Sequence, residues 1–164
     1  MFKENNLVRR LHASETMGGA NEICSDKTGT LTQNRMTVQA LYMGDQTMNG
    51  DTNPALAHDT NNIVLAQSVI FNSSARVETE QNGSKVVKGN VTEAGLIKYL
   101  LASKLDVEGY AEDKEQEGFV QFCIPFNSMR KRQTTAVKLA SGKVRVFCKG
   151  GPEILMDLCT RKLD

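Results

Sequence analysis

The chain has 164 residues, of which 40% are hydrophobic and 24% are charged, close to the usage of ordinary globular domains. Twenty basic and nineteen acidic side chains leave a formal net charge of +1, which excludes a polybasic nucleic-acid arm and an acidic tail. No apolar run approaches the roughly 18 residues of a membrane-spanning helix, and the first residues lack the apolar region of a secretory signal. We therefore expect one to one-and-a-half folded domains without a membrane helix.

The four cysteines are widely and unevenly spaced along the chain: Cys24, Cys123, Cys148 and Cys159. No pair forms the C-x-x-C spacing of a metal or redox site, so we expect small buried hydrophobic side chains in a reducing compartment. Three N-x-(S/T) triplets begin at Asn72, Asn82 and Asn90. They would carry sugar only in a secreted protein, which nothing else in the sequence indicates.

The first third of the chain predicts a short α/β segment. A helix is expected over 7–17, because apolar residues share one face and Gly18-Gly19 ends it. A buried strand is expected over 21–25, around Ile23 and Cys24, and the polar residues 26–32 follow it as a loop. A second strand is expected over 36–43 and a loop over 44–54.

The remainder predicts an α+β domain. Helices are expected from residue 56 to about 70, over 90–101 with Asn90 as cap, and over 153–159 with Pro152 at its first position. Asn82-Gly83 predicts a hairpin between strands 75–80 and 85–88. The acidic residues 106–117 indicate a solvated loop or short helix, and further strands are expected over 119–125, 133–139 and 143–148.

The loop after the first expected strand carries the clearest chemistry. A carboxylate such as Asp26 at the C-terminal end of a buried strand faces the crevice where ligands of open α/β sheets bind. Gly29 and the hydroxyls of Thr28 and Thr30 suit a phosphate, and Asp26 could attack a phosphoryl group if a divalent cation bridged the charges. The alternative is an ordinary Asx turn.

The string Asp26-Lys-Thr-Gly-Thr-Leu-Thr resembles the phosphorylation motif of the P-type ATPases, and segments 8–18 and 34–38 resemble the same family. The resemblance assigns the catalytic chemistry to Asp26, Lys27 and Thr30, with Asp26 phosphorylated by ATP and Thr30 holding phosphoryl oxygens. It implies Mg²⁺ held by the Asp26 carboxylate and the Thr28 carbonyl. The wider haloacid-dehalogenase superfamily often has a second Asp where Thr28 stands, so slow hydrolysis of the acyl phosphate is expected.

Three later segments resemble the nucleotide-binding domain of the same family. In Gly89-Asn-Val-Thr-Glu-Ala94, the resemblance places Glu93 against adenine, although Glu93 also fits the third position of a capping box. In Pro125-Phe-Asn-Ser-Met-Arg-Lys-Arg-Gln133, it implies that Phe126 stacks on adenine, that Lys131 meets the nucleotide and that Gln133 lines the pocket. Without the family, an isolated Phe after Pro, such as Phe126, is more often a core residue.

The third segment is Lys149-Gly-Gly-Pro-Glu153, which resembles the family's K-G-A-(P/S/A)-E motif. It implies Lys149 at the pocket floor and Gly150 beside the base, with Gly151 in place of the usual Ala. From Gly118 through Pro152 there is no acidic residue, while seven basic side chains occur. This asymmetry suits a triphosphate, and a solvated basic hairpin is the alternative.

The resemblance is strongest to the plasma-membrane type of calcium ATPase and covers nearly the whole chain. It implies an α/β start over 1–38, part of a haloacid-dehalogenase-like phosphorylation domain, and an α+β nucleotide-binding domain over 39–164, both incomplete. The expected function is ATP binding and phosphoryl transfer to Asp26, coupled to transport of a cation, most simply Ca²⁺, through membrane helices outside this sequence. The segment would face the cytoplasm, at the plasma membrane, without nucleic acid.

Two alternatives remain at this level. The first is a soluble phosphotransferase or phosphatase of the haloacid-dehalogenase type, against which Thr28 and the nucleotide-domain motifs both argue. The second is a non-catalytic nucleotide-binding module, which an isolated stretch of this length would resemble in practice. We expect the 164 residues alone to bind nucleotide weakly and not to turn over.

Overall fold

The computed structural model describes residues 10, 12–50 and 60–161. The chain divides into two units, 1–34 and 35–164, which are described separately. None of the described helices combines the length and the hydrophobicity needed to cross a membrane. The expected helix over 7–17 and the expected helix start at residue 56 lie partly outside the described residues.

Unit 1 contains one short helix and one turn within its described residues. Helix α1 (His12–Gly18) buries none of its side chains, and a wide turn follows at Lys27–Leu31. The strand expected over 21–25 is wrong, because this segment forms no strand and Ile23 is 87% exposed. A strand needs a neighbour for its backbone hydrogen bonds, and the described part of unit 1 offers none. The α/β start therefore stays a prediction.

Unit 2 begins with an antiparallel hairpin of β1 (Ala40–Met43) and β2 (Gln46–Asn49). The first strand is shorter than the expected 36–43, and β2 corrects the expected loop over 44–54 in its described part. The turn residues Gly44 and Asp45 both have positive φ, at 54° and 58°, as a two-residue hairpin turn requires. Cross-strand partners Leu41 and Met48 pack against the core, which stabilises a strand of otherwise polar sequence.

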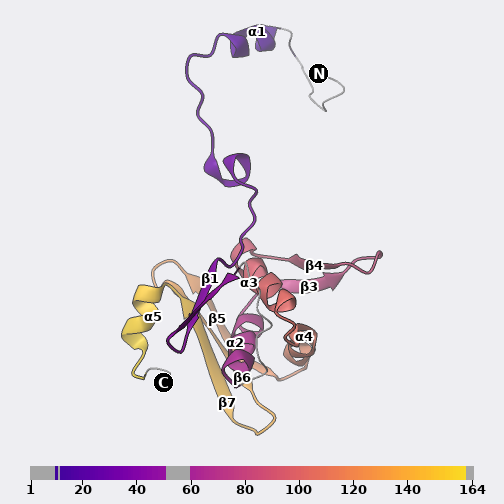
Figure 1. The fold of residues 1–164 in the computed structure, drawn as a ribbon, viewed down its shortest axis with the longest axis vertical. Helices are drawn as coiled ribbons and strands as arrows, with labels where there is room; N and C mark the ends of the chain where they lie inside the picture. Colours follow the sequence, from indigo (N-terminus) through magenta and orange to yellow (C-terminus); the bar gives the residue numbers. More distant parts are fainter. Residues whose placement is uncertain (1–9, 11, 51–59, 162–164) are drawn as a thin grey trace. The chain divides into compact units, whose positions relative to one another are not determined.

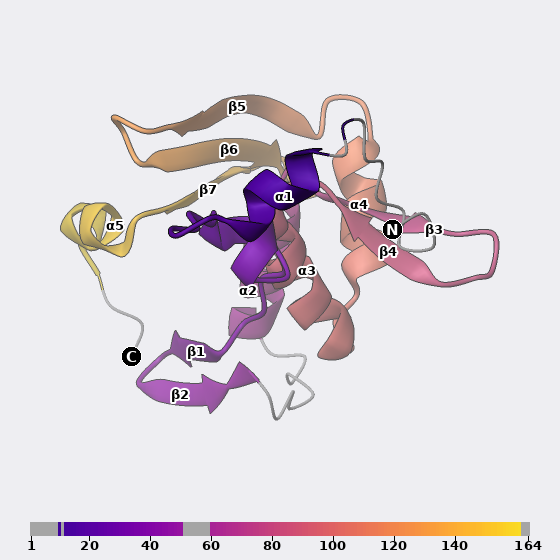
Figure 2. The same ribbon diagram turned by 90° about the horizontal axis from the view of Figure 1, so that it is seen from above.

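The rest of unit 2 is α+β with antiparallel sheets, as expected (Figures 1 and 2). Its helices are α2 (Thr60–Phe71), α3 (Val91–Ala102), α4 (Val107–Glu115) and α5 (Pro152–Leu158). Strands β3 (Arg76–Thr79) and β4 (Lys85–Lys88) form a hairpin, and β5 (Val120–Asn127), β6 (Arg132–Lys138) and β7 (Val144–Gly150) form a sheet in that order. The acidic segment 106–117 is thus largely the helix α4.

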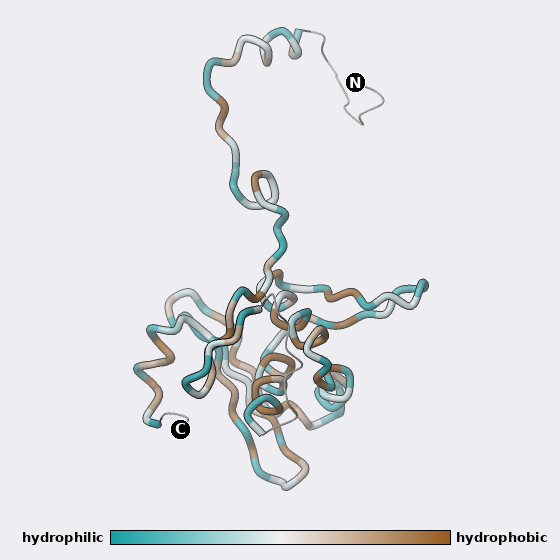
Figure 3. Tube along the Cα trace, in the orientation of Figure 1, coloured by the Kyte–Doolittle hydropathy of each residue, from teal (hydrophilic) through white to brown (hydrophobic). Residues whose placement is uncertain are grey.

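The core lies between this sheet and the helices α2, α3 and α4. Phe71 at the end of α2 is its centre, with ring centroids 4.8 Å from Phe119 and 5.9 Å from both Tyr110 and Phe147. Hydrophobic residues recur through α2 and α3, whereas the tip of the β3–β4 hairpin is hydrophilic (Figure 3). The packing holds the segment that follows α2 against β6 and β7.

The expected burial of the cysteines is wrong, because all four thiols are exposed. Side chains alternate along a strand, so the buried Phe147 leaves the next residue, Cys148, on the opposite face of the sheet. Cys123 lies in β5, which is an edge strand. Of the three glycosylation triplets, the one at Asn72 cannot be glycosylated in this fold, since Asn72 is fully buried.

Candidate functional site

Glu93 occupies the first turn of α3, where Asn90 caps the helix. The Asn90 Oδ1 accepts hydrogen bonds from the backbone N–H groups of Thr92 and Glu93, at 3.0 and 3.4 Å, which confirms the predicted cap. The Glu93 carboxylate does not complete a capping box. It points instead toward the segment 73–75 that follows α2, and toward β7.

Five hydrogen-bond donors surround the Glu93 carboxylate. Oε2 accepts from the backbone N–H and the hydroxyl of Ser74, at 2.8 and 2.6 Å, from the Ser73 hydroxyl at 3.1 Å and from the Ala75 N–H at 3.1 Å. Oε1 accepts from the Lys149 ammonium group. The side chains of Glu93 and Lys149 are 11% and 29% exposed, so the ion pair is largely shielded from water.

The surroundings of Glu93 fix its charge. Burial raises the pKa of this carboxyl, but the hydrogen bonds from Lys149 and Ser74 outweigh burial and lower the pKa from 4.5 to about 2. Glu93 is therefore ionised at neutral pH and acts only as a hydrogen-bond acceptor. Such a group suits a ligand that presents an amino group.

The segment after α2 is fastened to the sheet through Asn72. The Thr135 hydroxyl donates to the Asn72 Oδ1 at 2.8 Å, and the Asn72 side-chain amide donates to the carbonyls of Gln133 and Phe147 at 3.4 and 3.5 Å. The Gln133 side chain in turn donates to the Asn72 carbonyl at 3.4 Å. Because Gln133 and Lys149 are cross-strand partners, this register brings both onto the segment that holds Glu93.

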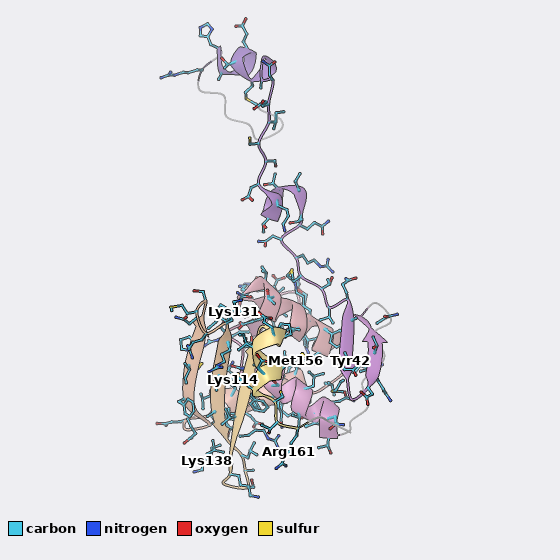
Figure 4. All side chains as sticks on the ribbon, turned by 90° about the vertical axis from the view of Figure 1, so that its left-hand side faces the viewer. Tyr42, Lys114, Lys131, Lys138, Met156 and Arg161 are labelled. Atoms are coloured by element: carbon cyan, nitrogen blue, oxygen red, sulfur yellow. The ribbon has the colours of Figure 1, made fainter. Side chains whose placement is uncertain are left out.

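The remaining predicted residues of the nucleotide site lie at one end of the same sheet. Lys131 closes the β5–β6 turn with φ of 49°, and its ammonium group lies 3.4 Å from the Glu153 carboxylate (Figure 4). Gly150 passes so close to this turn that a Cβ would lie 2.2 Å from the Lys131 carbonyl oxygen. Phe126 is 59% exposed, so the interpretation as a core residue is wrong and the ring is free to stack on a ligand.

The structure thus joins Glu93 to Lys149, the cross-strand partner of Gln133, and places Phe126, Lys131 and Gly150 at the same end of the sheet. Sequence reasoning missed the residues that complete the Glu93 surroundings: Asn72, Ser73, Ser74 and Lys114. The Asn72-Ser-Ser triplet was a possible signal, because these residue types favour caps and turns after a helix.

Asp26 precedes the turn of unit 1 and is exposed. Its Oδ1 accepts from the Lys27 N–H at 2.7 Å, a bond to the next residue, whereas an Asx turn bonds to the residue two positions on. Gly29 takes φ of 79°, and the Thr32 N–H closes the turn onto the Lys27 carbonyl at 3.1 Å. The described residues hold no cluster of three or more ligand-type side chains. One carboxylate and the Thr28 carbonyl still suit Mg²⁺, which usually keeps several waters and binds substrate phosphates.

Comparison with known proteins identifies the class of protein. Residues 61–164 match the family model described as P-type ATPase, cytoplasmic domain N. The chain therefore belongs to the P-type ATPase family, which confirms the resemblance found in the sequence.

The individual relatives narrow the class. The chain is 38% identical over its whole length to plasma membrane calcium-transporting ATPase 2 of Oreochromis mossambicus and covers 15% of that protein. It is 39% identical to calcium-transporting ATPase 3, plasma membrane-type, of Oryza sativa subsp. japonica, and 38% identical to plasma membrane calcium-transporting ATPase 3 of Homo sapiens. It covers 16% and 14% of those proteins, again over its whole length.

Proposed function

We propose that the chain is the ATP-binding and phosphoryl-accepting part of a plasma-membrane calcium-transporting ATPase. Residues 1–38 would belong to the phosphorylation domain and residues 39–164 to the nucleotide-binding domain, both on the cytoplasmic side of the membrane. The names of the relatives support transport of Ca²⁺. The observation that carries the proposal is the contact of Glu93 with Lys149, the cross-strand partner of Gln133, at the end of the sheet where β5 carries the exposed Phe126.

Each side chain has a role that its surroundings suit. The ionised Glu93 accepts a hydrogen bond from the exocyclic amino group of adenine, and Phe126 stacks on the base. Lys149 holds Glu93 in place at the pocket floor, and Gln133 lines the wall. Lys131 contributes positive charge at the sheet end, where Arg130 and Arg132 flank it and suit the phosphates. Gly150 lets β7 pass close to the Lys131 turn, so that its backbone lies beside the base.

Asp26 supplies the nucleophile. One carboxylate oxygen attacks the γ-phosphorus of ATP in line, an O–P bond forms, the bond from the γ-phosphorus to the β–γ bridging oxygen breaks, and ADP leaves with the electron pair. Lys27 and Thr30 lie in the same turn and orient the phosphoryl oxygens. The Asp26 carboxylate and the Thr28 carbonyl would hold Mg²⁺, which would neutralise charge on the phosphates.

Nucleotide binding is tested by titration calorimetry of the whole chain with ATP. We expect Phe126→Ala to weaken binding by about 1–3 kcal/mol, the range measured for bases stacked on aromatic side chains. Phe122→Ala is the matched control, because Phe122 is 49% exposed on the same strand and has no expected role. Equal affinity of the Phe126→Ala variant and the unmodified chain would contradict the stacking role.

Phosphoryl transfer is tested in the full-length pump that contains these residues. We expect Asp26→Asn to abolish acid-stable labelling by γ-labelled ATP while nucleotide binding persists, since the amide lacks a nucleophilic carboxylate oxygen. Labelling that survives the substitution would remove Asp26 from its role.

A further inference from the structure

Lys114 is a largely buried cation beneath the segment that holds Glu93. It is the basic residue of the acidic helix α4, and its ammonium group donates to the carbonyl oxygens of Ile70, at 3.0 Å, and of Ser73 (Figure 4). Both carbonyls lie at the C-terminal end of α2 or just beyond it, where helix carbonyls lack partners and carry partial negative charge. Lys114 therefore stabilises the backbone of the same segment whose donors bind Glu93.

One peptide group connects the two charges. The Ser73 carbonyl that accepts from Lys114 and the Ser74 N–H that donates to Glu93 at 2.8 Å belong to the same peptide unit. A cation on the carbonyl oxygen and an anion on the N–H polarise this unit in the same sense, so each hydrogen bond strengthens the other. The orientation of the Glu93 carboxylate therefore depends on a contact that Lys114 makes from the other side of the segment.

We propose that Lys114 is a positioning residue for nucleotide recognition, acting on Glu93 through the peptide group between Ser73 and Ser74. This inference rests on the proposed function. Burial lowers the pKa of Lys114, whereas the nearby Glu93 charge favours its protonated form, as expected of two groups that face one peptide. Lys114 does not touch the nucleotide, and its effect reaches the base only through the Glu93 oxygens.

Base selectivity distinguishes this role from a purely structural one. Glu93, as an ionised acceptor, favours adenine, which presents an amino group, over guanine, which presents a carbonyl oxygen at the same ring position. Lys114→Met removes the donors while keeping a long side chain, and the adjoining cavity of about 570 Å³ leaves room for it. If Glu93 loses its orientation, ATP affinity falls and the preference for ATP over GTP narrows.

The experiment measures ATP and GTP affinities of the whole chain by titration calorimetry, with thermal unfolding to confirm folding. We expect Lys114→Met to weaken ATP binding about fivefold and GTP binding less, and Lys98→Met, an exposed change on α3, to alter neither. In a Glu93→Gln background, Lys114→Met should have no further effect on ATP affinity. Lys114→Arg, which keeps charge and donors, should recover most of the preference for ATP.

The outcomes separate the inference from the proposed function. An unmodified chain that binds no ATP contradicts the proposed function. If the unmodified chain binds ATP and Lys114→Met binds it with the same affinity, only the inference is overturned. An equal loss of ATP and GTP affinity in Lys114→Met also overturns the inference, as does a loss of ATP affinity that persists in the Glu93→Gln background. If Lys114→Met does not fold, Lys114→Gln replaces it, and an unchanged ratio of ATP to GTP affinity in that folded variant overturns the inference.

Discussion

The ion pair between Glu93 and Lys149 should contribute to the free energy of unfolding, and this contribution can be measured. Glu93→Gln keeps the shape of the side chain but leaves the Lys149 ammonium, 29% exposed, without its anion. Breaking a fully buried pair costs about 3–5 kcal/mol and an exposed pair at most about 1, so we expect about 2–3 kcal/mol here. The lowering of the Glu93 pKa from 4.5 to about 2 sets an upper limit of about 3 kcal/mol on this loss at neutral pH, and screening by solvent reduces it.

Urea unfolding at pH 7, followed by circular dichroism, measures this loss. The matched control is Glu78→Gln, because the Glu78–Lys88 pair is short, at 2.7 Å, but its side chains are 51% and 63% exposed. We expect that variant to lose less than about 1 kcal/mol. If Glu93→Gln lost no more free energy of unfolding than Glu78→Gln, with unchanged m-values, the reasoning from burial and from the five donors would be refuted.

Three further predictions follow from neighbouring contacts. Because folding lowers the pKa of Glu93, the stability that this carboxylate contributes is present above pH 4.5 and is lost as the pH falls toward 2. The urea midpoint should therefore fall more steeply between pH 5 and 2 in the unmodified chain than in Glu93→Gln. Parallel curves of midpoint against pH would contradict this. Gly150→Ala places a Cβ 2.2 Å from the Lys131 carbonyl oxygen, so it should cost about 1–3 kcal/mol in urea unfolding and weaken ATP binding. Gly151 has φ of −60°, and the atoms nearest to an added Cβ belong to the flexible Glu153 carboxylate, so Gly151→Ala should be neutral or slightly stabilising. Equal effects of the two substitutions would refute this distinction. Asn72→Ala leaves the buried Thr135 hydroxyl with only a weak acceptor, the Cys123 Sγ at 3.4 Å, and should cost about 2–3 kcal/mol by the same assay. A loss below about 0.5 kcal/mol would show that the segment after α2 stays in place without Asn72.

Local signals in the sequence predicted much of unit 2. The hairpin at Asn82-Gly83 has Gly83 at φ of 80°, the cap at Asn90 forms as expected, and Pro152 begins α5. Each of these depends on residues a few positions apart, whose preferred backbone conformations agree with the final fold.

The errors concern pairing that neighbouring residues do not encode. The strand expected over 21–25 had the residue types of a strand but has no partner in the described part of unit 1. β2 was assigned to a loop because its sequence is polar, although pairing with β1 and the packing of Met48 make it a strand. In both cases the tertiary surroundings, which composition does not reveal, decided the outcome.

The family resemblance identified Glu93, Gln133 and Lys149, but not what holds them together. The sequence separations between Glu93 and Ser74, or between Lys114 and Ser73, are 19 and 41 residues, beyond any local pattern. In the sequence, Asn72, Ser73 and Ser74 stand out only as a glycosylation triplet, although their side chains face inward or toward Glu93.

The contacts of Glu93 argue against a role as part of a capping box. A capping glutamate remains at the helix surface and bonds its own first turn, which requires neither burial nor a distant cation. Glu93 is 11% exposed and takes its donors from the segment 73–75 and from Lys149 on β7. A buried ion pair contributes little stability compared with well-packed apolar residues of similar size, so the fold alone does not account for a charge at this position. A carboxylate kept ionised and oriented by five donors, at the end of a sheet that also carries an exposed aromatic ring, is better explained by a ligand that it must recognise.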